Sequence, residues 1–177
     1  MAKNTSNAAV LESIEIEQLA DLMRKAGYRV TPAEQNGHVQ LMSASQGVGF
    51  VVRFGNAGAT EGTFIDYTLS CALQVQGELP VELVPSWNRT KRFARLAPHG
   101  QFLVLEMDVV VAAGVTERHL ASMVELWDRL IQEFLLHMRN RPTMMAAQEA
   151  SLTSKPNVLT GDRSAESGDE VAPVTIQ

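Results

Sequence analysis

Two carboxylates lie two residues apart in an apolar stretch, Glu106 and Asp108 within QFLVLEMDVVV at residues 101–111. In a strand this spacing puts both on one face, about 6–7 Å apart. Such a pair can act as general acid and base or bind a divalent cation. Because nothing in the sequence supplies a nucleophile, an oxyanion hole or further ligands, we favour a solvated face with cross-strand Arg or Lys partners. A metal-dependent enzyme built on this pair remains the alternative.

The histidines, the cysteine and the glycine-rich loop give no indication of a catalytic residue, a metal site or a cofactor site. The histidines have no second ligand at metal spacing, so we expect surface positions for His38, His99, His119 and His137. Cys71, the single cysteine, faces the apolar side of its strand and is expected to be buried and inert. The loop GNAGATEG leads into a strand and lacks the Lys-Ser/Thr of a phosphate-binding loop.

A basic stretch, SWNRTKRFARL at residues 86–96, stands out in a chain with a net charge of −5. That net charge argues against coating nucleic acid or an anionic membrane through the whole surface, because such binding needs excess Lys and Arg. Cations in the last turn of a helix are also favoured by the helix dipole. A groove for an acidic peptide, or less favourably for nucleic acid, is the alternative to this local explanation.

Periodicity predicts the elements that position these residues. We expect helices at 13–27, 81–92 and 116–139, a hairpin turning at Asn36-Gly37, strands at 48–54 and 63–75, and a second hairpin turning at Pro98-His99-Gly100. The order α-β-β-β-β-α-β-β-α predicts one α+β domain at residues 13–141, with helices on one face of a largely antiparallel sheet. Residues 1–12 are predicted to be flexible, and the polar segment 142–177 to be a disordered tail.

The last predicted helix carries the strongest apolar periodicity in the chain. Its stripe consists of Leu120, Val124, Trp127, Ile131, Phe134 and Met138. We favour a core helix lying on the sheet. A self-association seam is compatible with this, because so broad a stripe exceeds what one small sheet can cover.

The runs WNRTKRFARL, LVLEMDVVVAAGVT and LASMVELWDRLIQEF, with LADLMRKAGYRV near the start, resemble the YbjN family over residues 14–138. The resemblance implies a fold similar to type III secretion chaperones, which are small α+β proteins that commonly dimerise and bind extended segments of other proteins. It also implies a role in bacterial sensory transduction without an established enzymatic activity. The motif positions have no settled role in the family; they are Trp87, Asn88, Lys91, Arg92, Phe93, Glu106, Met107 and Asp108.

We therefore expect a non-enzymatic protein-binding module, a chaperone-like or regulatory adaptor in bacterial signalling or stress response. The predicted partner-binding residues are Trp87, Arg89, Lys91, Arg92 and Arg95. A homodimer is expected, with no membrane partner. The sequence shows neither a signal-peptide pattern nor eighteen uninterrupted apolar residues, so a cytoplasmic location is predicted.

Overall fold

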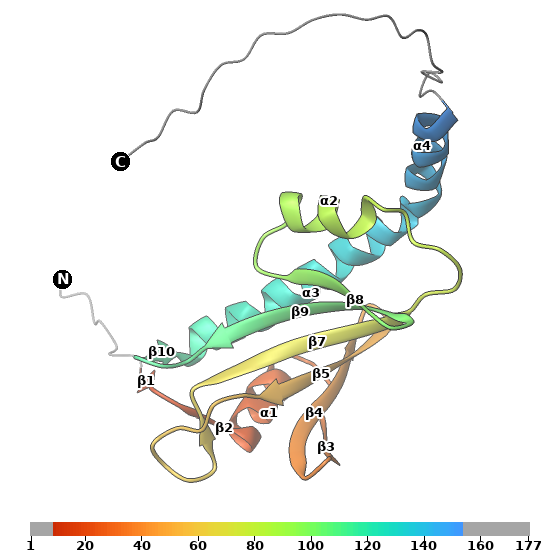
Figure 1. The fold of residues 1–177 in the computed structure, drawn as a ribbon. Helices are drawn as coiled ribbons and strands as arrows, with labels where there is room; N and C mark the ends of the chain where they lie inside the picture. Colours follow the sequence, from red (N-terminus) through yellow and green to blue (C-terminus); the bar gives the residue numbers. More distant parts are fainter. Residues whose placement is uncertain (1–8, 154–177) are drawn as a thin grey trace, which may run out of the picture.

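The computed structural model describes residues 9–153 and confirms the predicted α+β class. A six-stranded, fully antiparallel sheet forms its centre (Figure 1). Across the sheet the strands are β3 (Thr31–Gln35), β4 (His38–Ser45), β5 (Val48–Phe54), β7 (Asp66–Gln74), β9 (Phe102–Val110) and β8 (Arg95–His99). Strands β3 and β8 are therefore the two edges.

The two tight turns differ in how closely they follow prediction. Asn36 and Gly37 both have positive φ, 54° and 78°, so the hairpin between β3 and β4 is the predicted one. In the second hairpin His99 still pairs with Phe102 across β8 and β9. The chain reverses at Gly100 and Gln101, later than the predicted Pro98-His99-Gly100 turn.

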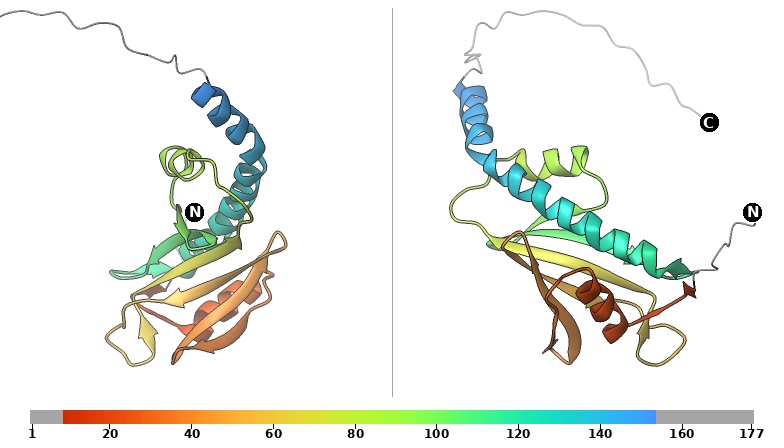
Figure 2. Two further views of the ribbon diagram at one scale, coloured as in Figure 1. Left: turned by 45° about the vertical axis from the view of Figure 1, so that its right-hand side comes forward. Right: turned by 180° about the vertical axis from the view of Figure 1, so that it is seen from behind.

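Three helices were predicted, and residues 9–153 contain four. The helices are α1 (Ile16–Lys25), α2 (Leu83–Thr90), α3 (Glu117–Arg139) and α4 (Arg141–Thr153). Helices α1 and α3 cover one face of the sheet, and α2 lies beside the edge strand β8 (Figures 1 and 2). Thr116 caps α3 as expected, because its hydroxyl accepts the His119 N–H at 3.2 Å.

Alternation along the central strands sorts side chains between the two faces. Leu69 and Cys71 of β7, and Leu105 and Met107 of β9, point into the core under the helices and are buried. No helix within residues 9–153 covers the opposite face, which we call the open face (Figure 2). Glu106 and Asp108 lie on the open face, as the spacing predicted.

The apolar stripe of α3 belongs to the core. Leu120, Val124, Trp127, Ile131 and Phe134 are buried, and the half-buried Met138 packs against the same core. The prediction that these six residues form a self-association seam is therefore wrong: the sheet and the neighbouring helices already cover the stripe.

Two short strands precede α1, one where the sequence predicted flexibility and one where it predicted the start of the helix. β1 (Val10–Leu11) pairs with β10 (Val115–Thr116), and β2 (Ile14–Glu15) pairs with β6 (Thr63–Phe64). The predicted flexibility of residues 1–12 is thus wrong for β1, and residues 1–8 lie outside the described residues.

Helix α4 corrects the prediction for residues 142–153. Pro142 is its second residue, where the missing N–H costs little, so Arg141-Pro142 separates two helices. Arg141 donates to the carbonyls of Gln76 and Glu78, and Gln148 accepts the Val81 N–H at 2.9 Å. No α4 side chain is fully buried, so these polar contacts, together with the half-buried Met144 that packs against the core, hold it. The rest of the predicted tail, residues 154–177, lies outside the described residues.

Among residues 9–153, no helix combines the length and the apolarity that crossing a membrane requires.

Candidate functional site

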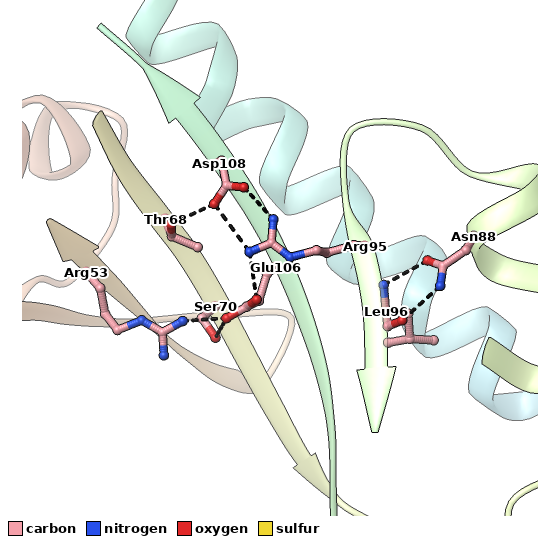
Figure 3. Close-up of polar contacts among 8 residues, drawn as sticks. All are labelled: Arg53, Thr68, Ser70, Asn88, Arg95, Leu96, Glu106 and Asp108. Atoms are coloured by element: carbon pink, nitrogen blue, oxygen red, sulfur yellow. Dashed lines mark hydrogen bonds and ion pairs between the residues drawn. The ribbon is translucent and has the colours of Figure 1, made fainter. Parts of the chain in front are cut away.

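The acidic pair of β9 forms a charge network on the open face. Register places Glu106 opposite Arg95 and Asp108 opposite Thr68. Arg95 contacts both carboxylates, with Nη2 2.8 Å from Glu106 Oε2. Arg53 of β5 pairs with Glu106 from the other side, and Thr68 donates to Asp108 at 2.7 Å (Figure 3). The predicted cross-strand pairing of these acids is confirmed.

This network favours the ionised form of Asp108. Hydrogen bonds from Arg95, and then from Thr68, lower the pKa of Asp108 below its ordinary value. A general acid or base works best with a pKa near the working pH, so the direction of this shift is opposite to the one catalysis needs. Within residues 9–153, no three His, Cys, Asp or Glu side chains are grouped so as to hold a metal ion. The ion pairs of this network link β5, β8 and β9 and so suit a structural role.

We expect Asp108→Asn to destabilise the protein at neutral pH by less than about 1 kcal/mol, because the lost ion pair is half exposed and screened by solvent. A carboxylate with a lowered folded-state pKa stabilises above its unfolded pKa, and this contribution is lost as the pH falls through the folded value. The difference between Asp108→Asn and the unchanged chain should therefore shrink as the pH falls below about 3.8, the ordinary pKa of Asp, and vanish only below the lowered pKa of the folded state. Urea unfolding at pH 7 and at a series of pH values below 3.8 measures this. A difference that persists at low pH would mean that shape, not charge, matters here.

The histidines and the cysteine follow prediction with one exception. His38, His99 and His119 are exposed, while Cys71 is buried, which raises the pKa of its thiol to about 11. His137 is half-buried instead: its Nε2 donates to the Leu83 carbonyl at 2.8 Å and so joins α3 to α2.

The cations of the basic stretch do not form one patch. Arg95 is in the open-face network, and Arg89 pairs with Glu82 at 2.8 Å on the exposed side of α2. Lys91 reaches α3, where its Nζ lies 2.7 Å from Glu133 Oε2. Arg92 lies over the ring of Phe93, 5.2 Å from its centroid. Local partners thus separate what the sequence grouped together.

Trp87 is fully buried, so its assignment to partner binding is wrong. Its ring meets Phe134 and His137 edge-on, at centroid distances of 5.8 and 5.5 Å. Its Nε1–H donates to the Ala94 carbonyl at 3.1 Å. The indole therefore joins α2 to α3 and to the loop before β8.

The side chain of Asn88 hydrogen-bonds to the backbone of the edge strand β8. Its Nδ2 donates to the Leu96 carbonyl, and its Oδ1 accepts the Leu96 N–H, both at 2.9 Å (Figure 3). One side-chain amide thus occupies the two backbone groups that a further strand would bind at this position. The Trp-Asn pair docks α2 onto the end of the sheet.

Phe93 is held on the surface in a costly conformation. Its φ is +74°, in the left-handed region, and its side chain is 64% exposed. This region costs a residue other than glycine about 1–2 kcal/mol. Strain of this kind, maintained by the surrounding structure, is most often found at functional sites.

Beside Phe93 is a hollow of about 410 Å³, which we call the α2–α3 hollow. Its walls include Lys91, Arg92, Phe93, Leu126, Arg129 and Glu133. Three of these side chains are cations and one is an acid. Within the described chain, Arg92 and Arg129 form no ion pair. Leu126 and Arg129 were not predicted to be site residues; their one distinguishing feature in the sequence is that both lie off the apolar stripe of α3.

A family model for "YbjN: Putative bacterial sensory transduction regulator" matches residues 15–140, well over half of the chain. The comparisons with curated proteins and with solved structures gave no significant match. The likeness to type III secretion chaperones thus stays a prediction. The match covers the sheet, α2 with its docked edge and all of α3, and on this evidence the chain belongs to the YbjN family of bacterial regulators.

Proposed function

We propose that the protein is a cytoplasmic, non-enzymatic regulatory module that binds a protein partner, as an adaptor or chaperone, at the α2–α3 hollow. The observation that carries this proposal is Phe93, an exposed aromatic residue held at positive φ beside Arg92 in the wall of the hollow. The family's regulatory description agrees with such a role.

The motif residues divide into two groups by their contacts. The first group turns inward or sideways and fixes α2 to its surroundings. Its contacts are Trp87 with Ala94, Asn88 with Leu96, and Lys91 with Glu133. Arg92 and Phe93 point outward, and Phe93 adds little to the core that would offset its backbone strain. The first group therefore holds the second in place.

The composition of the hollow indicates the kind of partner. Aromatic residues and arginine are the side chains that most often dominate protein interfaces. Arg92 and Arg129 supply positive charge that is not paired with an acidic side chain of residues 9–153, while Phe93 and Leu126 supply apolar area. An acidic protein segment that also carries an apolar side chain complements both.

We expect Phe93→Ala, or Arg92→Glu combined with Arg129→Glu, to reduce capture of the partner at least about tenfold, because interface hot spots contribute 2 kcal/mol or more. The full-length chain and its variants are used as bait in an extract of the native host, and captured chains are quantified by mass spectrometry. Arg118→Glu is the matched control, because Arg118 is an exposed arginine on α3, the helix that carries Arg129.

Phe93→Gly separates binding from folding. Glycine adopts a φ of +74° without the steric cost, so this variant should be at least as stable as Phe93→Ala and still lose capture. Unchanged capture by all the Phe93 and arginine variants would contradict the proposal. An equal loss with Arg118→Glu would contradict it too, by showing that only overall charge matters.

Homodimerisation stays a prediction from the family resemblance. The α3 stripe is buried within one chain, so a dimer needs another surface. Light scattering on the purified protein measures the oligomeric state.

A further inference from the structure

We propose that the chain's own C-terminal segment, around residues 162–176, occupies the α2–α3 hollow and competes with the partner for it. The inference rests on the proposed function for the choice of site and adds a regulatory occupant. It draws on the charge of the hollow, the composition of the segment and the length of chain that joins them.

The charges of the two sites are complementary. Glu133 offsets Lys91 in the hollow, which leaves the positive charges of Arg92 and Arg129 without a partner in residues 9–153. The sequence GDRSAESGDE at 161–170 carries four acids and one arginine. The net charge of the chain is −5, so two exposed arginines close together are a local positive charge that attracts the acidic segment.

The apolar parts match as well. VAPVTI follows the acids directly, at residues 171–176. Phe93 is 64% exposed, and Leu126, which is half-buried, lines the same hollow. An acidic run followed by small apolar side chains can therefore place charge against the arginines and methyl groups against the ring.

The connecting chain is long enough. From Glu133 to Thr153 the chain is almost entirely helical, so this path spans at most about 30 Å at 1.5 Å per residue. The residues from Thr153 to Glu166 span up to about 40 Å when extended. The acids can thus return to the hollow, and tethering gives them an effective concentration in the millimolar range. Even a weak contact then competes with an external partner.

A spin label at Ser167→Cys in the full-length protein tests this placement. Cys71 is buried and its thiol pKa is raised, so labelling at neutral pH favours the introduced cysteine. We expect the label to broaden the backbone amide signals of Arg92, Phe93 and Arg129 in nuclear magnetic resonance spectra. Broadening should be lost at about 1 M salt, where screening is strong. It should also be lost with Arg92→Glu plus Arg129→Glu, and kept with Arg118→Glu.

Three results would overturn the inference. The first is the absence of broadening at the hollow, and the second is broadening that the arginine reversals leave unchanged. The third is broadening of ¹⁵N-labelled chains by spin-labelled chains of ordinary isotopic composition, because the segment then binds a second copy.

Capture experiments separate this inference from the proposed function. Neutralising the segment with Glu166→Gln, Asp169→Asn and Glu170→Gln should increase partner capture, and unchanged capture would refute the competition. If the label shows no docking while the Phe93 variants still lose capture, the regulatory inference fails and the proposed function stands. If docking is seen but no hollow variant affects capture, the proposed function fails.

Discussion

Replacing Trp87 by alanine is expected to lower the free energy of unfolding by about 3–5 kcal/mol, the usual cost of emptying a buried aromatic site. The indole is fully buried against Phe134 and His137, so the substitution leaves a cavity where α2 meets α3. It also leaves the Ala94 carbonyl without its donor. Urea unfolding followed by circular dichroism measures the loss.

Trp87→Phe separates the two contributions. The smaller ring keeps most of the packing and removes the N–H, so we expect a loss of about 1–3 kcal/mol, the cost of an unsatisfied buried polar group. Equal losses for both variants would mean that the hydrogen bond to Ala94 dominates. A loss below about 1 kcal/mol for Trp87→Ala would contradict the assignment of Trp87 to the core.

Asn88→Leu is expected to cost about 1–3 kcal/mol and to make the protein associate. Leucine keeps the approximate size of the side chain and removes both hydrogen bonds to Leu96, a buried residue of the edge strand. The freed N–H and C=O are then open to a strand from another molecule. Urea unfolding gives the first effect, and light scattering over a range of protein concentrations gives the second.

Asn88→Asp is the diagnostic control. Its carboxylate can still accept the Leu96 N–H but cannot donate to the Leu96 carbonyl. We therefore expect it to be destabilised as well, while its charge opposes association. If Asn88→Leu associates no further than the unchanged chain and is equally stable, the side chain does not protect this edge.

Much of the fold follows from local sequence patterns. Alternation along 63–75 and 101–111 places Cys71 in the core and Glu106 on the open face, because neighbouring side chains of a strand point to opposite faces. The Asn36-Gly37 turn follows from the positive φ that both residues tolerate. The stripe of α3 follows from helical periodicity, although periodicity alone does not tell whether an apolar face meets its own sheet or a second chain.

The candidate site is less predictable because distant residues build it. Arg92 and Arg129 line one hollow only because α2 docks on β8 and α3 packs beside it, and no local pattern encodes that packing. Trp87 illustrates the difficulty: tryptophan is common both in interfaces and in cores, and its burial depends on Phe134, far along the chain. The short pairing of β1 with β10 is missed for the same reason.

Helix α4 lies between the folded domain and residue 154, and its length sets how far from the sheet the rest of the chain begins. Its contacts with the rest of the domain include Arg141, Met144 and Gln148, so a turn added or removed after Gln148 changes little of the folding free energy. Its 13 residues nonetheless carry the chain about 20 Å onward before residue 154. Length variation at this one place therefore offers a simple way to retune how far the protein extends from its sheet while keeping the domain intact.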